Sequence, residues 1–529
     1  MKQQILKGIK VYKLWHGGIG IGSMSDGKKI LIKGWALPGS IVDLTVVKRR
    51  KDYIEAHILE TKKYDEDFSD GEIFCPHYYI AKGESLINEG TSKIGCWGCK
   101  WQMINYEKQL QIKQQLVEDS FKKITKENPI RFLPILSSPL QRGYRNKIEF
   151  SFWPYIQQTE EYRKLHKQGV EDEEIEKQGI VKYKLHDPWN CGFHKQGEFS
   201  KIIDVDRCGL ISEEANALYW YLKKKCKESW LPIYDQKTHQ GFFRHLVIRE
   251  GVHTHQLMVN LSVSLDNLNA QTSELRNTLL QEFKSDPFLK EKLTTFVITN
   301  NAGLSDTVRN DKSEPSIFWW EGVIHEELHF WEETDETVVT FRISPFSFFQ
   351  TNTFGAERLF STAFQMLGNF KGNILDLYCG AGSIGLSLLK LAQKEKKSNT
   401  QLVGIEIVED AIIDARHNAK INGLDEQSFF VASPAEKALA NFPELQEKIN
   451  NLGVVVIDPP REGLHPNVID RIANLKKEYP FKLLYISCNP VTMARDIELF
   501  IEKGFTCKEV QPVDLFPHTH HIEDIAVLE

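Results

Sequence analysis

The chain has 529 residues, of which 41% are hydrophobic and 26% are charged, a composition typical of a globular protein. At roughly 150 residues per domain, this length predicts three or so domains. No run of about 18 apolar residues occurs and the N-terminus lacks the apolar core of a secretory signal, so we expect neither a membrane span nor export.

Nine cysteines in a large chain without an export signal predict a cytoplasmic protein with reduced thiols, available for metal binding or chemistry. The net charge of −6 is unevenly distributed, because residues 1–63 hold 13 lysines and arginines against 5 acids, a net +8. A basic segment attached to an acidic remainder is consistent with a module that binds phosphates next to a part that does chemistry. A solvated lysine-rich surface would give the same charge pattern.

Residues 1–63 have the pattern of short strands separated by turns. Gly17-Gly18-Ile19-Gly20, Asp26-Gly27 and Pro38-Gly39 are turn signals, and residues 29–33 and 40–47 have strand composition. Five or so strands in this length predict a small β-barrel of the OB type, a fold that often binds single-stranded RNA. A purely structural barrel is the alternative.

Residues 64–340 predict a second, β-rich region. Its first stretch, 64–100, is loop-like and carries three cysteines, and apolar residues at helical spacing predict a helix over about 104–124 that packs on the catalytic domain. Within the β-rich stretch 140–340, the highly charged segment 157–188 lacks clear periodicity and predicts an exposed insertion without an assigned role.

Residues 341–529 alternate apolar runs with helical stretches. This alternation predicts βαβ units and a parallel sheet with helices on both faces, which is a Rossmann-like α/β domain. The apolar runs that we expect to be strands are 373–378, 402–407, 428–431, 454–457 and 483–486.

The first of these runs leads into a glycine loop, Gly380-x-Gly382-x-x-Gly385. Such a loop lets the backbone approach a ligand closely, and by itself it fits NAD, FAD or S-adenosylmethionine. The next strand ends at Glu406, where a carboxylate can accept both ribose hydroxyls. A later strand ends in Asp458-Pro459-Pro460, which is typical of nucleobase-modifying methyltransferases.

Two further residues carry candidate chemistry. Cys488 follows the strand that ends in Leu484-Tyr485-Ile486-Ser487, so it lies over the ligand crevice of a parallel sheet. Glu523 follows Phe516-Pro517-His518-Thr519-His520-His521 near the C-terminus and is a candidate base. An inert strand-end thiol and an exposed carboxylate are the ordinary alternatives.

These residues resemble those of a known family. The chain is similar over nearly its whole length to the TRAM-domain RNA (uracil-5-)-methyltransferases, and within them to the iron–sulfur, RlmD-like branch that acts on bacterial 23S rRNA. The segments that carry the resemblance are Ser487-Cys488-Asn489-Pro490, Phe516-Pro517-His518-Thr519 before Glu523, Asp458-Pro459-Pro460-Arg461, Ser344-Pro345-x-Ser347-Phe348-Phe349-Gln350-x-Asn352, Gly143-Tyr144-Arg145-Asn146-Lys147 and Arg244-His245-Leu246-Val247-Ile248-Arg249.

The resemblance implies a mechanism and a set of roles. Cys488 adds to carbon 6 of uracil, which makes carbon 5 nucleophilic enough to accept a methyl group, and Glu523 then removes the proton on carbon 5. The residues implied to bind S-adenosyl-L-methionine are Gln350, Tyr378, Ser383, Glu406 and Asp458, with Ser433 as a weaker match. It also implies a TRAM barrel over residues 1–63, a central domain over 64–340 and a methyltransferase domain over 341–529.

Four cysteines form a candidate metal site, namely Cys75, Cys96, Cys99 and Cys208. Four thiolates suit zinc or a [4Fe–4S] cluster equally by ligand count, and the resemblance favours iron–sulfur. Unliganded thiols are the remaining alternative.

The leading hypothesis is therefore an rRNA uridine-5-methyltransferase. The same catalytic parts serve a tRNA T-loop uridine methyltransferase, and only the cysteines favour rRNA. A non-catalytic RNA-binding factor would not need both Cys488 and Glu523, and an amino-methyltransferase acting through Asp458-Pro459-Pro460 would need no cysteine at 488.

Overall fold

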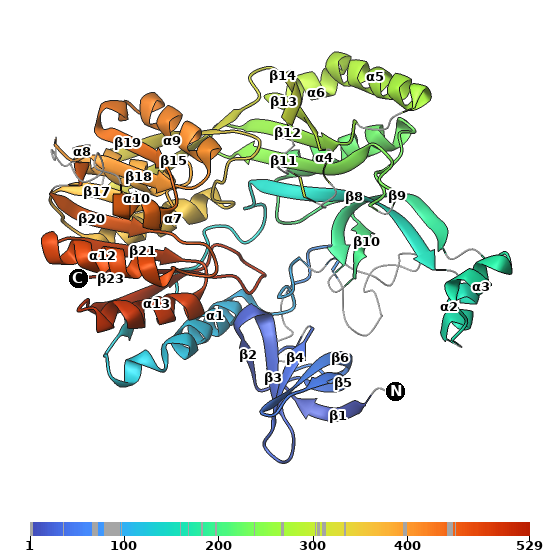
Figure 1. Cartoon of the computed structure of the whole chain (residues 1–529), viewed down its shortest axis with the longest axis horizontal. Coiled ribbons are helices and arrows are strands. Elements are labelled where there is room, and N and C mark those ends of the chain that lie inside the picture. Colours follow the sequence, from blue (N-terminus) through green and yellow to red (C-terminus); the bar gives the residue numbers. More distant parts are fainter. Residues whose placement is uncertain are drawn as a thin grey trace.

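The computed structural model describes residues 4–529 except 35, 66–71, 79–95, 97, 159, 168, 181–182, 196–197, 237, 266–268, 302, 304–306, 309–313, 333–334, 395–398, 442–447 and 450. Three strand-bearing parts follow one another along the chain (Figure 1). In the described chain, none of the helices combines the length and the apolar composition needed to cross a bilayer.

The N-terminal part is a six-stranded sheet in the order β1-β5-β6-β4-β3-β2. Its strands are β1 (Ile5–Lys10), β2 (Lys13–Trp15), β3 (Ile19–Ser23), β4 (Lys29–Lys33), β5 (Ile41–Arg49) and β6 (Tyr53–Lys63). The sheet curls so that β3 approaches β1. The close approach is visible at Gly22 of β3, where a Cβ atom would lie only 2.7 Å from the side chain of Ile9. The expected strand-rich barrel is present.

The central part is a seven-stranded sheet in the order β10-β9-β8-β11-β12-β13-β14. Its strands are β8 (Lys147–Gln158), β9 (Tyr183–Lys195), β10 (Glu198–Asp204), β11 (Phe243–Gly251), β12 (Gln256–Val263), β13 (Thr295–Asn300) and β14 (Glu314–Trp319). Helices α4 (Glu213–Glu228), α5 (Ala270–Ser285) and α6 (Pro287–Lys292) pack on its apolar face. The opposite face of β8, β11 and β12 is mostly polar.

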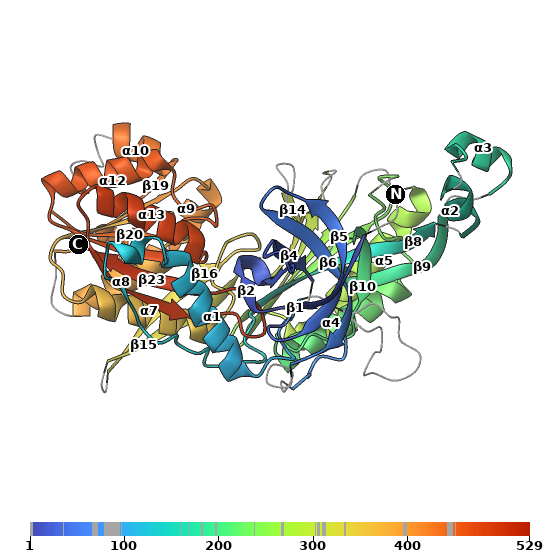
Figure 2. The ribbon, with the colours of Figure 1, turned by 90° about the horizontal axis from the view of Figure 1, so that it is seen from below.

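The charged segment 157–188 is more regular than its sequence predicts. It contains the end of β8, two short helices and the start of β9, with the helices α2 (Glu160–Lys167) and α3 (Asp172–Lys177) lying beyond the strand ends (Figures 1 and 2). Tyr162 and Ile175 are buried where the two helices pack together. This local packing stabilises helices that are too short for a periodic sequence pattern.

The C-terminal part is an eight-stranded sheet in the order β19-β18-β17-β20-β21-β23-β22-β7. Its strands are β17 (Asn373–Leu377), β18 (Leu402–Glu406), β19 (Ser428–Ala432), β20 (Leu452–Ile457), β21 (Lys482–Ser487), β22 (Cys507–Val513), β23 (Glu523–Leu528) and β7 (Arg131–Phe132). All described pairings are parallel except those of β23. The Rossmann-like α/β prediction is confirmed.

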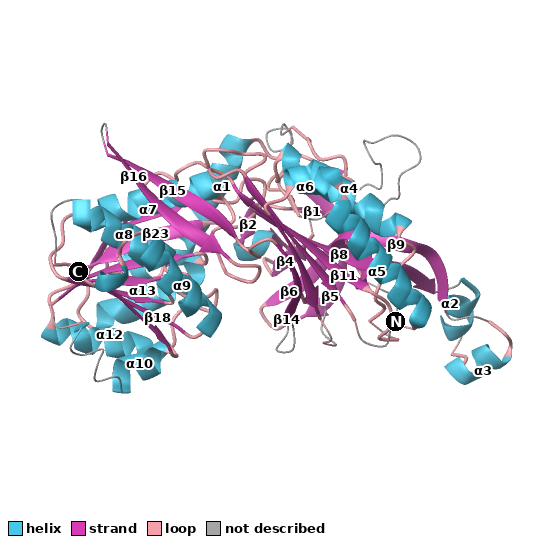
Figure 3. Ribbon diagram, turned by 90° about the horizontal axis from the view of Figure 1, so that it is seen from above, coloured by secondary structure: helices cyan, strands magenta, loops and turns pink. Residues whose placement is uncertain are grey.

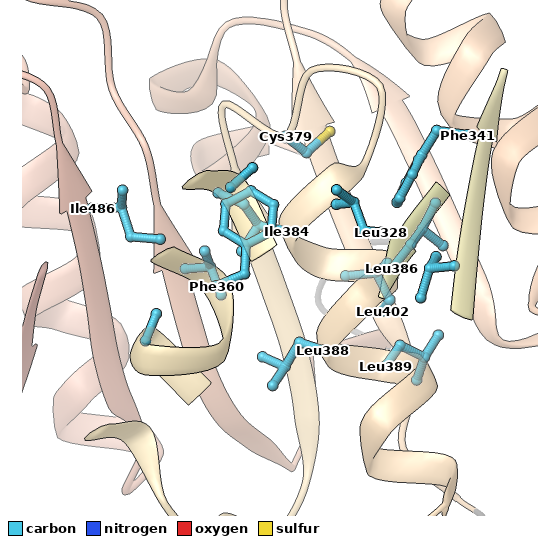
Figure 4. Close-up of a cluster of buried hydrophobic side chains, with 14 of the residues drawn as sticks. Leu328, Phe341, Phe360, Cys379, Ile384, Leu386, Leu388, Leu389, Leu402 and Ile486 are labelled. Carbon is cyan, nitrogen blue, oxygen red and sulfur yellow. The ribbon is translucent and has the colours of Figure 1, made fainter. Parts of the chain in front are cut away.

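Helices cover both faces of this sheet (Figure 3). They are α7 (Thr353–Leu367), α8 (Ser383–Lys394), α9 (Glu409–Ile421), α10 (Ala435–Asn441), α12 (Pro466–Glu478) and α13 (Pro490–Glu502). The first three share one apolar core with the hairpin β15 (Ile324–Glu332) and β16 (Asp335–Ile343), as Leu328 and Phe341 beside Leu386 and Leu402 illustrate (Figure 4). The boundary expected at residue 340 therefore falls inside β16.

Helix α1 (Tyr106–Phe121) lies against the C-terminal sheet although it precedes the central part in the chain (Figure 1). Its Val117 and Phe121 are fully buried in the core that α13 and β22 share. A helix thus spans 106–121 within the stretch 104–124, and it packs on the C-terminal sheet.

Candidate active site

Strand register places five acidic or thiol side chains on one face of the C-terminal sheet. Asp376 pairs with Gly404 and Val456, so Glu406 and Asp458, each two residues later, share its face. The pairing of Val456 with Leu484, and of Ser487 with Asp524, carries the same face on to Cys488 and Glu523. All five stand at the edge where the parallel strands end.

The mutual electrostatic effects of these groups agree with the register. Burial, followed by the nearby Glu523 and Asp458, raises the pKa of Cys488 to about 12, and Arg461 opposes them. Burial holds the pKa of Glu523 well above its usual range, and Asp458 and Asp524 add to this effect. Before ligands bind, Cys488 is therefore a thiol at neutral pH, and the surroundings of Glu523 favour its protonated form.

A small pocket of about 50 Å³ opens onto the sulfur. Its lining residues are Arg461, Cys488, Asn489, His520, His521 and Ile522. The Asn489 side-chain amide donates a hydrogen bond of 2.9 Å to the Arg461 carbonyl, which joins the loops after β20 and β21. Burial lowers the pKa of His521 to about 3, so its neutral ring can accept from the Arg461 guanidinium 3.3 Å away.

The glycine loop forms the tight turn between β17 and α8. Gly380 and Gly382 have φ of +53° and +83°, and a Cβ on Gly385 would lie 2.6 Å from Asp376 Oδ2. The Gly385 amide donates to that oxygen at 3.0 Å, while Asp376 Oδ1 is buried without a hydrogen-bond partner. Tyr378 also has a left-handed backbone, with φ of +65°.

Glu406 organises the neighbouring strand end. One of its carboxylate oxygens accepts from the Gly380 amide at 3.2 Å, and the other accepts from the amides of Ile407 and Val408. The Ser433 amide donates to the Glu406 carbonyl at 2.8 Å. Ser383 begins α8 at the end of the glycine loop and is half-buried.

Gln350 lies in a loop that the central sheet holds in place. The residue is 7% exposed, and the Asn146 side-chain amide donates to the backbone carbonyl of Gln350 at 2.9 Å. Asn146 also donates to the Thr353 hydroxyl, and Arg249 donates to the Ser347 carbonyl at 2.6 Å. Asn146 and Arg249, which lie in segments 143–147 and 244–249, thus hold the loop that carries Gln350.

The chain can hold S-adenosyl-L-methionine at this edge. Glycines without room for a side chain, a strand-end carboxylate and an unpartnered buried oxygen of Asp376 lie together there. Such a set can accept hydroxyl and ammonium groups while the backbone approaches the ligand closely.

Comparisons with known proteins agree with this geometry. A model of the family described as tRNA (Uracil-5-)-methyltransferase matches residues 317–529. An uncharacterized RNA methyltransferase of Caldanaerobacter subterraneus subsp. tengcongensis is 33% identical over 98% of both chains. Another, of Chlorobaculum tepidum, is 32% identical over 96% of this chain and 93% of its own.

The chain belongs to the RNA (uracil-5-)-methyltransferase family. It is thus an RNA methyltransferase, a transferase of class 2.1.1 that uses S-adenosyl-L-methionine. The crystal structure of the Pyrococcus abyssi tRNA (uracil-54, C5)-methyltransferase in complex with S-adenosyl-L-homocysteine has the same fold, with a TM-score of 0.65 and 24% identity, covering 99% of this chain and 100% of that one.

The loop that leads to Glu523 in this methyltransferase is held by segments from distant parts of the chain. Lys113 of α1 donates to Asp514 Oδ1 at 2.6 Å, and both side chains are fully buried. The Gln109 side chain accepts from the His518 amide at 2.8 Å, and the Tyr144 hydroxyl donates to the Pro517 carbonyl at 3.2 Å. The ion pair between Lys113 and Asp514 therefore joins the loop to helix α1.

The four candidate metal-binding cysteines lie near one another, beside this same loop. Burial raises the pKa of Cys99, and the thiols of Cys208, Cys96 and Cys75 raise it further. The Trp101 amide, two residues after Cys99, donates to the His518 carbonyl. Even so, the described residues include no group of three or more His, Cys, Asp or Glu side chains placed to hold a metal ion.

The sequence did not point to several residues that organise the site. Asp376 is visible in the sequence as an acid inside an apolar strand, four residues before the first glycine of the loop. Lys113 and Gln109 carry no local signal, because their partners lie 401 and 409 residues away along the chain. Asn146 lies in a segment that carries the family resemblance, but its contact with Gln350 spans 204 residues and could not be predicted locally.

Proposed function

We propose that this methyltransferase modifies carbon 5 of a uridine in 23S rRNA, with Cys488 as covalent nucleophile and Glu523 as base. The observation that carries the proposal is the register that sets these two residues opposite each other across β21 and β23. The residues proposed to bind the cofactor are Gln350, Tyr378, Ser383, Glu406 and Asp458, with Ser433 beside them. We also propose that the protein acts in the cytoplasm and that residues 1–63, 64–340 and 341–529 form its three units, with α1, β7 and the β15–β16 hairpin adding to the third.

The proposed chemistry begins at the Cys488 sulfur. The thiolate forms a bond to carbon 6 of uracil, and the electron pair of the 5,6 double bond moves into the carbonyl at carbon 4. S-adenosyl-L-methionine, when bound, would supply the electrophilic methyl group for carbon 5, with S-adenosyl-L-homocysteine as the leaving group. Glu523 removes the proton from carbon 5, the double bond forms again and the carbon–sulfur bond breaks.

Each residue has its own test with synthetic uridine-containing RNA and labelled S-adenosyl-L-methionine. Cys488→Ala should lose all methyl transfer, because no adduct forms. Glu523→Gln should methylate the base but fail to release it, leaving a protein–RNA adduct that survives a denaturing gel. Methylation by Cys488→Ala would disprove covalent catalysis, and a Glu523→Gln variant that turns over normally would remove Glu523 as the base.

A tRNA substrate is the second candidate. The matching family model is described as tRNA (Uracil-5-)-methyltransferase, and the structural neighbour acts on tRNA uracil 54. Mapping 5-methyluridine in 23S rRNA and tRNA from a deletion strain decides between them, because the missing methyl group identifies the substrate. Loss from tRNA alone would overturn the rRNA assignment.

We further propose that Cys75, Cys96, Cys99 and Cys208 hold a [4Fe–4S] cluster, with zinc as the alternative. The proposal rests on the donor set and on the mutual influence of the four thiols. Binding would require the side chains to move closer together than they are here. Anaerobically purified protein should contain about four iron atoms per chain and absorb near about 400 nm. Colourless protein that contains zinc would contradict the proposed iron–sulfur cluster.

A further inference from the structure

Three cations gather at the edge of the central sheet that faces the methyltransferase part. Lys147 begins β8 and pairs with Arg249 of β11, so the two side chains stand side by side on the same face of the sheet. Arg145 comes two residues before Lys147, and its Nε donates to the Lys147 carbonyl at 2.7 Å. This end of β8 lies next to the C-terminal part (Figure 1).

These cations are buried more deeply than their charges favour. Arg249 is 4% exposed, its Nε has no hydrogen-bond partner, and its guanidinium donates to the Ser347 carbonyl. Lys147 is half-buried, and its ammonium forms no hydrogen bond or ion pair with any residue that the structure describes. Burying a cation without a counter-ion costs free energy, and a bound anion would offset this cost. The cluster therefore favours anion binding.

The cations also repel one another. Burial, together with the charges of Arg249 and Arg145, lowers the pKa of Lys147 to about 8, while exposed Glu149 opposes the effect without forming an ion pair. Burial likewise lowers the pKa of Arg249 to about 10, opposed by Asp414 and Glu149. Asp414 is already paired with Arg342 and Ser344, so it does not neutralise the cluster.

The position of the cluster identifies the kind of anion. Arg249 contacts the loop that carries Gln350, and Phe348 in that loop is 64% exposed. Cations interleaved with an exposed aromatic ring are typical of a surface that follows single-stranded nucleic acid. The cluster therefore lies beside the loop that carries the exposed Phe348 and the proposed cofactor residue Gln350.

We propose that Arg145, Lys147 and Arg249 bind a backbone phosphate of the substrate RNA next to the uridine that enters the active site. The inference rests on the assignment of RNA as substrate and adds a phosphate contact to it. Arg249 also holds the Gln350 loop and Arg145 lies near Cys99 and Cys208, so Lys147 is the residue whose loss tests the phosphate contact alone.

The experiment measures RNA binding to the full-length protein with a labelled stem–loop RNA that has one uridine in its loop. Lys147→Gln should weaken binding about tenfold at low salt, because a charge-assisted hydrogen bond is lost. The slope of log affinity against log salt should fall by about 1, as expected for one phosphate contact. Lys147→Arg should retain both. Lys284→Gln, on α5 at the opposite face of the sheet, is the matched control and should change neither.

Two further measurements separate the alternatives. Binding of S-adenosyl-L-homocysteine should be unchanged in Lys147→Gln, and the RNA-free variant should melt at the same or a higher temperature, because a repelled charge has been removed. Unchanged RNA affinity and salt slope would overturn the proposal. So would a loss of S-adenosyl-L-homocysteine affinity alone, since the anion would then be the carboxylate of the cofactor. If Lys147→Gln keeps wild-type RNA binding and Cys488→Ala is inactive, the phosphate site is disproved and the proposed chemistry is unaffected.

Discussion

Cys488 and its neighbours show why a half-buried thiol beside carboxyl groups keeps its proton at neutral pH. Burial is the largest cause of its high pKa, and the nearby Asp458 contributes through its charge. Arg461 acts in the opposite direction and lowers the pKa of the thiol. Low solvation therefore keeps the Cys488 thiol weakly reactive toward electrophiles.

The reactivity of Cys488 should follow this pKa. Alkylation of Cys488 by iodoacetamide, measured on its peptide by mass spectrometry, should increase about tenfold per pH unit from pH 7 to pH 10, because the thiolate fraction increases in that way below the pKa. Asp458→Asn should react faster at pH 8, since it removes a negative charge that raises the pKa. A wild-type rate that levels off near pH 9 would contradict the assignment.

At the scale of elements, helix α1 and the loop 514–522 act as one piece. The helix lies on the C-terminal sheet through Val117 and Phe121, and it meets the loop through the buried pair of Lys113 and Asp514. Asp514 also accepts from the Tyr106 hydroxyl at 2.9 Å. Because Glu523 follows directly, the position of the proposed base depends on a helix about 400 residues earlier in the chain.

Breaking this pair should be more harmful than removing both charges. Lys113→Met should lower the free energy of unfolding by about 3 kcal/mol, because it leaves the Asp514 carboxylate buried without its cation. The double variant Lys113→Met with Asp514→Asn should recover most of this loss. Denaturant unfolding of both variants measures the difference, with Lys122→Met on the exposed end of the helix as control. Equal losses in the single and double variants would rule out this account.

At the scale of the whole molecule, buried acids make stability depend on pH. Burial raises the pKa of Asp458 to about 7 and that of Asp376 to about 8, and Asp524 is raised well above its usual range with both oxygens unpartnered. For each of them the folded state binds a proton that the unfolded state releases. Stability from these groups is complete below pH 4 and is lost as pH increases through the folded pKa.

The ligand-free protein should therefore become less stable between pH 6.5 and pH 8. Histidines with lowered pKa values, such as His518 and His521, oppose this fall only near the lower end of the range, because their unfolded rings still bind protons near pH 6.5. Asp524→Asn should make the fall shallower, because it removes a buried group whose folded pKa is raised. Thermal unfolding at four pH values measures it, and Asp425→Asn on the surface serves as control. A slope identical to the wild type would mean that Asp524 is ionised in the fold.

Much of the C-terminal part could be predicted from local pattern. Buried parallel strands such as β17 and β20 are short apolar runs, and the glycine loop, Glu406, Asp458 and Cys488 stand at their ends. Strand ends of a parallel sheet meet at one edge, so sequence order alone brings these residues together. The segment 157–188 was predicted less well, because helices as short as α2 and α3 depend on each other's buried side chains rather than on their own periodicity.

The amino-acid sequence by itself determined the fold class, the family and the strand-end residues, because strand periodicity and motif spacing are local properties. Only the tertiary structure decided which distant groups complete the site. The Asn146 contact with the Gln350 loop, the Lys113 contact with Asp514 and the gathering of Arg145, Lys147 and Arg249 depend on packing between segments about 100 to 400 residues apart. The burial that raises the pKa values of Cys488 and Glu523 is likewise a property of the folded chain, because it depends on which groups exclude water from the sheet edge.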